Sequence, residues 1–318
     1  MPPSQLVRSE TENIHVYDCV VGKYLVGDQQ HSHMDRFSQE QNLLPPGPIN
    51  QAVGENVLFV TLPSPQPLSA IRWHFKSSEV VTYIHPGPVT VNLSYVGRVI
   101  LNYSTGALEL KNLTMADTGE YQLTLTYANG IGHKDHTLLQ VFEPVFGLGI
   151  TSPEGNVIEF GSANFTCKGN GTITNTIWMK GNEILAPSSS ITFLDDSRTM
   201  MISPVKRSDS GNYHCEINNP VSSSKASFSI TVNYGPDVRI LGASTLEVDS
   251  DILLYCSTDS VPPAIVTWTM KGMSIGNTPL YFIVNSNPSN SGDYNCTGWN
   301  NVTGLTVSAV HVLTVKVM

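Results

Sequence analysis

The sequence predicts an all-β chain of three consecutive β-sandwich domains. Short runs of alternating apolar and polar residues are separated by turn residues, and no run has helical periodicity of useful length. A tryptophan followed by an Asp/Asn-x-Gly-x-Tyr run appears three times along the chain. The length of 318 residues fits three small all-β domains of about 100 residues each.

The second copy of this pattern is the clearest. Phe165 and Cys167 alternate onto one face of an expected strand, Trp178 follows, and Tyr213 precedes Cys215 by two residues. This order is typical of immunoglobulin-type sandwiches, in which the cysteines bridge the two sheets and the tryptophan packs on the bridge. The tyrosine ring is expected inside, with its hydroxyl bonded to nearby backbone.

The third copy repeats the order with Leu254, Cys256, Trp268, Tyr294 and Cys296. The two cysteine pairs, separated by 48 and 40 residues, therefore predict two disulfides and an oxidising compartment. On the chain-entropy model each bridge is worth roughly 4 kcal/mol. These two domains are interpreted as I/C2-like.

The first copy keeps Trp73 and Tyr121 but has no cysteine pair. Its bridge positions are occupied by about Thr61 and by Leu123. We therefore interpret it as a V-like domain without a disulfide, held by apolar packing.

An ion pair is expected to compensate for the missing bridge. Arg98 opens a strand and Asp117 lies just before the tyrosine corner, where variable-type domains close one end of the sandwich. A partly buried bidentate pair of this kind tolerates the loss of one partner badly.

The composition and motif content argue against several classes of function. The chain has 17 basic and 26 acidic residues, a net charge of −9, and no basic stripe, so nucleic acid is not an expected partner. It contains no catalytic motif and no Cys-x-x-Cys pair, and we expect no enzyme activity, cofactor or metal. No apolar stretch is long enough to span a membrane.

The amino-terminal segment is polar and aperiodic, so we expect it to be disordered. Cys19 has no partner in the expected pairing and is either a free thiol or a link between chains. His31 and His33 are interpreted as solvated residues rather than metal ligands. No secretory signal is recognised in a chain with disulfide spacings, and our hypothesis is that the sequence is a fragment. The predicted units are a disordered segment at 1–45, a V-like domain at 46–143, and I/C2-like domains at 146–233 and 236–317.

The arrangement resembles the carcinoembryonic-antigen-related cell adhesion molecule family over about residues 46–317. A first domain with Arg98 and Asp117 but no disulfide precedes two domains with disulfides, joined by the linker 234–236, which reads Tyr-Gly-Pro. The run 106–121, GALELKNLTMADTGEY, carries most of the resemblance, and the hepatocyte cell adhesion molecule group is the nearest rival. The resemblance implies an adhesion or recognition protein, extracellular, at the cell surface or secreted.

Seven Asn-x-Ser/Thr sequons predict N-linked glycans. They lie at Asn92, Asn102, Asn112, Asn164, Asn170, Asn295 and Asn301. In the first domain the sheet built around Trp73, residues 80–84, 121–127 and 136–141 carries no sequon, so it is the expected contact surface.

In the carcinoembryonic-antigen-related cell adhesion molecule family, which this chain resembles, the corresponding face mediates homophilic and heterophilic binding. Strand alternation around Trp73 and Tyr121 gives the candidate outward residues here. They are Arg72, His74, Glu79, Val81, Tyr83, Gln122, Thr124 and Thr126. Two alternatives stay open: an immune-cell receptor ectodomain with inhibitory or activating signalling, and a soluble decoy ligand.

Overall fold

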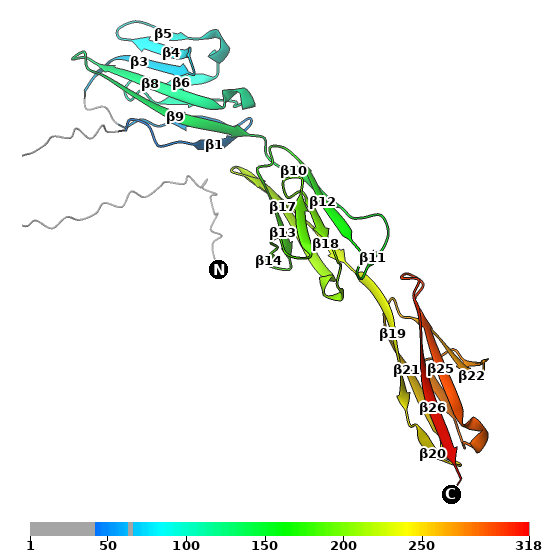
Figure 1. The fold of residues 1–318 in the computed structure, drawn as a ribbon. Helices are drawn as coiled ribbons and strands as arrows, with labels where there is room; N and C mark the ends of the chain where they lie inside the picture. The colour runs from blue at the N-terminus through cyan, green and yellow to red at the C-terminus, as the bar shows by residue number, and fades with distance from the viewer. Residues whose placement is uncertain (1–41, 63–65, 318) are drawn as a thin grey trace, which may run out of the picture. The chain divides into compact units, whose positions relative to one another are not determined.

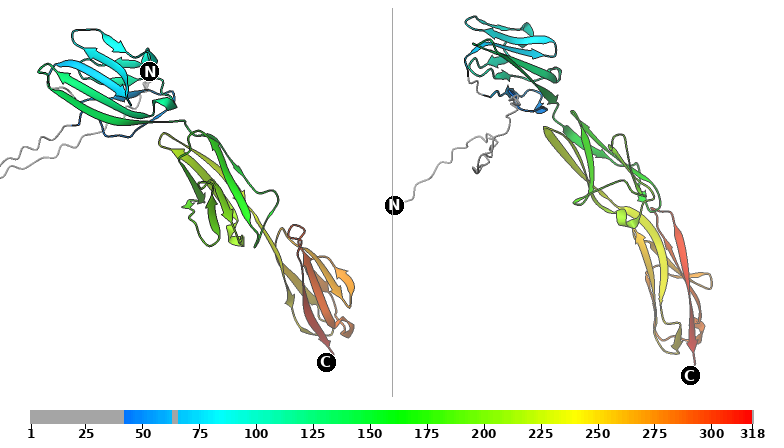
Figure 2. Two further views of the ribbon diagram at one scale, coloured as in Figure 1. Left: turned by 45° about the horizontal axis from the view of Figure 1, so that its top comes forward. Right: turned by 60° about the vertical axis from the view of Figure 1, so that its left-hand side comes forward.

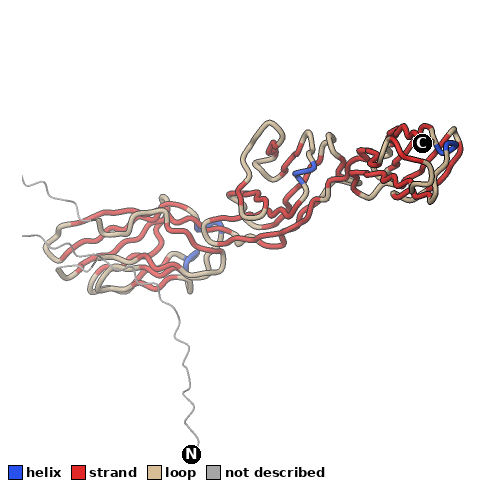
Figure 3. The backbone as a smooth tube through the Cα atoms, turned by 90° about the horizontal axis from the view of Figure 1, so that it is seen from below, coloured by secondary structure: helices blue, strands red, loops and turns tan. Residues whose placement is uncertain are grey.

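The computed structural model describes residues 42–62 and 66–317, and the regular secondary structure of this part is almost entirely strand (Figure 1). Figure 3 shows the few helical segments of this part, which are four short 3-10 turns. The expectation of an all-β chain of tandem immunoglobulin-like domains is confirmed. Cys19, His31 and His33 lie outside the described residues, as does most of the segment expected to be disordered.

The first domain packs a six-stranded sheet against a three-stranded one. The six-stranded sheet has the order β1-β9-β8-β3-β4-β5 and the other the order β2-β7-β6. The strands and turns are β1 Ile49–Ala52, β2 Val57–Phe59, β3 Leu68–Phe75, β4 Ser78–Ile84, β5 Val89–Val91, η1 Leu93–Tyr95, β6 Val99–Leu101, β7 Leu108–Leu110, η2 Met115–Asp117, β8 Gly119–Tyr127 and β9 Gly132–Phe142.

An aromatic cluster occupies the centre of this domain where the other two have a disulfide. Phe59 contacts Trp73 and Tyr121 with ring centroids 5.3 and 4.8 Å apart. Thr61 and Leu123, the residues expected at the bridge positions, are both buried. The domain thus replaces a covalent link with aromatic contacts, which are worth about 0.5–1.5 kcal/mol each beyond burial.

This domain begins earlier than the sequence predicts. Leu44 is buried in its core, and its amide donates to Asp135 Oδ2 at 2.8 Å. Thr137 Oγ1 donates to the carbonyl of Pro45 at 3.2 Å. The expectation of disorder is therefore wrong for residues 42–45, because two leucines in an otherwise polar segment are enough to anchor it on the core.

The second domain is formed by two four-stranded sheets, with orders β10-β12-β16-β15 and β14-β13-β17-β18. Its elements are β10 Phe146–Thr151, β11 Val157–Ile158, β12 Ala163–Asn170, β13 Asn175–Lys180, β14 Glu183–Ile184, β15 Ile191–Leu194, β16 Thr199–Ile202, η3 Arg207–Asp209, β17 Gly211–Asn219 and β18 Ser222–Ile230.

The third domain has one sheet of order β19-β21-β24, which β11 extends beyond β19, and a five-stranded sheet of order β20-β26-β25-β22-β23. The views in Figure 2 show the two layers of strands in each domain. The elements are β19 Val232–Gly242, β20 Thr245–Glu247, β21 Ile252–Val261, β22 Ile265–Met270, β23 Met273–Gly276, β24 Leu280–Ile283, η4 Pro288–Asn290, β25 Gly292–Trp299 and β26 Thr306–Lys316.

The predicted disulfides are both present, and each lies beside its tryptophan in a buried core. Cys167 pairs with Cys215 and Cys256 with Cys296. The paired register places Trp178 opposite Cys215, and Trp268 takes the same position in the third domain.

The polar ends of the buried aromatic residues are satisfied in the same way in all three domains. Each tryptophan Nε1 donates to a backbone carbonyl, at distances of 2.7 to 2.9 Å. Each tyrosine hydroxyl donates to the carbonyl four residues upstream, at 2.8 to 3.1 Å, which is the expected tyrosine corner. Burial also raises the pKa of these tyrosines, to about 12 for Tyr213.

The different cross-links predict a different response to reduction. With a thiol reductant, the second and third domains each lose roughly 4 kcal/mol of stability, while the first domain is unaffected. Differential scanning calorimetry of the full chain should therefore show one thermal transition that stays in place and two that fall. Two double variants show which of the falling transitions belongs to which domain: Cys167→Ala/Cys215→Ala for the second and Cys256→Ala/Cys296→Ala for the third. A first-domain transition that shifts with the reductant would contradict the prediction.

Candidate functional site

The outer face of the six-stranded sheet in the first domain is a flat, polar surface. Its register aligns side chains into rows that cross several strands. One row contains Thr90, Thr82, Arg72, Thr124 and Lys134. A second row contains Glu79, His74, Gln122 and His136. We call the side chains of these two rows, with Thr126, the polar face.

The polar face carries positive and negative side chains, with threonine side chains between them. Arg72 and Lys134 flank Thr124, while Glu79 lies opposite His74 in the next row. The side chains on the central strands are half-buried and those on the outer strands are exposed. Such a surface offers hydrogen bonds and charge pairs rather than an apolar anchor.

Two polar atoms of this face are buried without a hydrogen-bond partner among the described residues. They are His74 Nδ1 and Thr82 Oγ1. An unsatisfied buried polar group costs about 1–3 kcal/mol, so these two atoms lower the stability of the free domain at this face.

The structure corrects two of the residues expected on this face. A β-bulge between Trp73 and His74 sets Val80 and Val81 together opposite Trp73, and both are fully buried. Beyond the bulge the alternation is shifted by one, so Tyr83 points inward, where its ring lies 4.9 Å from that of Tyr103. Thr82 takes the outward position instead, and Arg72, His74, Glu79, Gln122, Thr124 and Thr126 lie on the face as expected.

The sequons of this domain lie away from the polar face. Asn92 follows the edge strand β5, Asn102 follows β6 and Asn112 follows β7, and all three are exposed. In the other domains Asn164, Asn170 and Asn301 are exposed, whereas Asn295 is half-buried on β25 with an unpaired Oδ1. No sequon lies on β3, β4, β8 or β9. The use of each sequon remains a prediction.

The predicted ion pair closes one end of the first domain. Arg98 Nη2 and Nη1 donate to the two carboxylate oxygens of Asp117 at 2.5 and 3.2 Å. Asp117 also accepts from the amide and the hydroxyl of Thr114 at 2.8 and 2.9 Å, and its side chain is only 6% exposed. This pairing raises the pKa of Arg98, since the charged form is stabilised by its partner.

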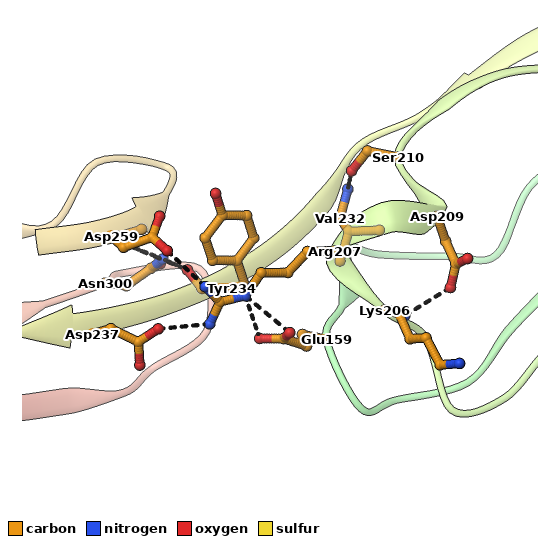
Figure 4. Close-up of polar contacts among 11 residues, drawn as sticks. Glu159, Lys206, Arg207, Asp209, Ser210, Val232, Tyr234, Asp237, Asp259 and Asn300 are labelled. Carbon is orange, nitrogen blue, oxygen red and sulfur yellow. Dashed lines mark hydrogen bonds and ion pairs between the residues drawn. The ribbon is translucent and has the colours of Figure 1, made fainter.

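A second charge cluster, which the sequence did not reveal, connects the second and third domains. Arg207 on η3 donates from Nε to Glu159 at 2.9 Å, from Nη1 to Asp259 at 2.7 Å and from Nη2 to Asp237 at 2.8 Å (Figure 4). Its guanidinium also lies over the ring of Tyr234, 4.1 Å from the centroid. One cation therefore pairs with carboxylates from both domains and stacks on the linker between them.

Two buried asparagines hold the linkers from within the domains. Asn219 Nδ2 donates to the carbonyls of Glu143 and Thr172, both at 2.8 Å. Asn300 Nδ2 donates to the carbonyl of Tyr234 at 3.0 Å, and its Oδ1 accepts from two following amides. Both asparagines lie four residues after the second cysteine, a spacing that could have revealed them in the sequence.

The described residues contain neither a cluster of metal-ligating side chains nor a membrane-spanning helix. No group of three or more His, Cys, Asp or Glu side chains is arranged for a metal ion within residues 42–62 and 66–317. No helix in that part of the chain has the length and apolarity needed to cross a membrane.

Comparison with known protein families identifies the two disulfide-containing domains. Residues 150–232 match the immunoglobulin I-set domain and residues 240–315 match an immunoglobulin domain model. Among curated proteins, the human peroxidasin homolog is 28% identical over 220 residues, which are 65% of this chain and 14% of that protein. Mouse hemicentin-1 is 26% identical over 175 residues, 53% of this chain. The chain spans only small parts of these relatives, 14% and 3% of their lengths.

Among solved structures, murine CEACAM1b is 28% identical, with a TM-score of 0.53. The match covers 57% of this chain and 95% of that one. A murine receptor solved with a mouse coronavirus receptor-binding domain gives a TM-score of 0.50 at the same identity and coverage. The titin fragment I67–I69, at 22% identity and a TM-score of 0.54, covers 86% of this chain and 97% of its own, and shares the fold.

We expect Asp117→Ala to destabilise the first domain by about 3–5 kcal/mol, because Arg98 would lose the one carboxylate that pairs with it among the described residues and stay partly buried. Chemical denaturation followed by the fluorescence of the first domain measures this loss. Glu120→Ala, an exposed acid three residues away, is the matched control and should change stability by less than about 0.5 kcal/mol. Equal stability of the two variants would refute the structural role of the pair.

We expect Arg207→Ala to loosen the junction between the second and third domains. The cluster is about one-third exposed at Arg207, so added salt should have part of the same effect. Limited proteolysis measures this loosening: the rate of cleavage near residues 234–236 should rise while the domains stay folded. Arg198→Ala, an exposed arginine of the same domain with no ion pair among the described residues, is the control and should cleave at the wild-type rate.

Proposed function

Because the chain belongs to the immunoglobulin superfamily, we propose that it is a non-enzymatic recognition protein that binds a protein ligand through the polar face of its first domain. The ligand class that fits is a second copy of the chain or a related adhesion molecule. The two disulfides and seven sequons support an extracellular or cell-surface location for the chain.

The observation that carries this proposal is the pair of unsatisfied groups on a sequon-free sheet. His74 Nδ1 and Thr82 Oγ1 lie on neighbouring strands of the polar face. A protein partner that bonds to them after the His74 and Thr82 side chains rotate outward recovers the desolvation cost that the free domain bears. Glycans on the other strands would shield the rest of the domain and leave this sheet accessible.

The mixed charge of the polar face favours association with itself or a close relative. Arg72 and Lys134 lie one row from Glu79, so an antiparallel pairing of two copies can bring opposite charges together. The likeness to murine CEACAM1b, at 28% identity, supports membership of the carcinoembryonic-antigen-related cell adhesion molecule family.

A receptor function is the second candidate, and one comparison favours it. The murine receptor that resembles this chain was solved in complex with a mouse coronavirus receptor-binding domain. A flat hydrogen-bonding face of the kind described here suits a foreign protein as well as a second copy of the chain.

Bead aggregation with the full chain tests the proposal, with the chain itself as the probe. Thr124→Arg places a bulky cation between Arg72 and Lys134 and should weaken association at least 30-fold, about 2 kcal/mol. His74→Ala should also weaken it. Leu58→Arg, at a 56% exposed position on the opposite sheet, is the matched control and should aggregate beads like the wild type. Aggregation that survives both face variants would place the contact elsewhere.

A further inference from the structure

The outer face of the β19-β21-β24 sheet in the third domain is apolar and solvent-exposed. Its register places large side chains in adjoining rows, with Leu241 beside Tyr255 and Leu280, and Leu253 beside Phe282. Each is between 46% exposed, for Tyr255, and 59% exposed, for Leu241. We call this set the apolar face, and it consists of Leu241, Leu253, Tyr255, Leu280, Phe282 and Val284.

The fold does not require apolar side chains at every one of these positions, because the second domain has polar residues at three of the matching ones. Counting from the first cysteine of each domain, Leu253 and Tyr255 correspond to Asn164 and Thr166. Thr151 takes the position of Leu241 on the strand paired with it. In the second domain this face therefore carries a sequon, while in the third it carries exposed apolar side chains.

Both sequons of the third domain lie outside this sheet. Asn295 is on β25, in the opposite sheet, and Asn301 follows the same strand. A glycan would leave the apolar face uncovered. In addition, β24 is an edge strand, which leaves backbone groups next to the apolar side chains unpaired.

We propose that the apolar face is a self-association surface that binds the same face of a second copy of the chain. The six side chains expose on the order of 500 Å² of apolar surface, taking roughly 170 Å² for a fully exposed large apolar side chain. A specific interface buries about 800 Å² per partner. The apolar face together with the polar residues around it therefore has the area that a weak dimer needs. An identical partner fits because its surface is apolar over the same extent.

The charged residues at the two ends of the apolar face complement each other in a two-fold dimer. Arg239 lies in the row of Ser257, beyond one end, and Asp251 lies just before Leu253, at the other. Arg239 makes no ion pair among the described residues. A two-fold axis that crosses the strands between Leu253 and Tyr255 exchanges the ends and brings Arg239 of each copy toward Asp251 of the other.

Sedimentation velocity of the full glycosylated chain tests this surface independently of the proposed function. All variants are made in the Thr124→Arg background, so that the polar face of the first domain does not contribute. The parent should self-associate with a Kd on the order of 10 µM, and a monomer at concentrations up to about 100 µM overturns the proposal.

The decisive variant is Leu253→Asn/Tyr255→Thr, which gives the third domain the sequon pattern that the second domain has at Asn164 and Thr166. It should abolish self-association while the domain remains folded by calorimetry. The matched control is Val310→Asn/Val312→Thr, which adds a sequon on the opposite sheet at positions 61% and 60% exposed. Association that survives the first variant, or is lost equally in the control, contradicts the proposal.

A charge exchange tests the orientation of the two copies. Arg239→Asp should weaken self-association about tenfold, because each of two symmetric pairs becomes repulsive. Adding Asp251→Arg should restore it, since the signs are again opposite. If Arg239→Asp has no effect, or Asp251→Arg fails to restore association, the proposed two-fold arrangement is wrong.

Discussion

In a sandwich of two sheets about 10 Å apart, a single layer of side chains fills the interior. In all three domains that layer is centred on a fully buried tryptophan whose Nε1 donates to a backbone carbonyl. Because the tryptophan must point inward, the alternation of its strand is fixed, and with it the side chains presented to solvent. The polar face of the first domain follows from this constraint. In the third domain the buried Cys256 fixes the alternation of β21 in the same way, and with it the apolar face on the sheet opposite Trp268. Only the cross-link at the centre differs, since Phe59 replaces a disulfide in the first domain.

The same architecture presents three chemically different surfaces. The first domain offers a mixed-charge sheet with two unsatisfied polar atoms. The second offers a sheet with a sequon at Asn164, and the third offers exposed aromatic and aliphatic side chains. The buried positions are nearly interchangeable between the domains, whereas the outward positions have diverged. These differences match the two proposals made above, recognition through the first domain and self-association through the third.

Charged residues are scarce in this chain, at 14% of the sequence, and the described ion pairs are concentrated at two places. One pair, between Arg98 and Asp117, closes the domain that lacks a disulfide. The other three converge on Arg207 between the second and third domains. Buried asparagines satisfy linker carbonyls, Asn219 that of Glu143 and Asn300 that of Tyr234. Ion pairs thus stabilise one end of the first domain and the junction of the second and third, while apolar packing stabilises the cores.

The order of residue types along the chain is enough to predict the fold class, both disulfides, the tryptophan and tyrosine positions and the Arg98–Asp117 pair. Each of these depends on residue identity at a characteristic spacing. Alternation from the buried Trp73 gives the outward positions of Arg72 and His74, and alternation from Tyr121 gives that of Thr124, in agreement with the register of β3 and β8. The tertiary structure alone decided that Val81 and Tyr83 point inward, because one extra residue in a bulge reverses the alternation beyond it. It also decided the Arg207 cluster and the apolar face, whose members come from strands far apart in the chain. Contacts of this kind depend on the register between strands, and register is set by the packing of the whole sheet rather than by any local run of residues.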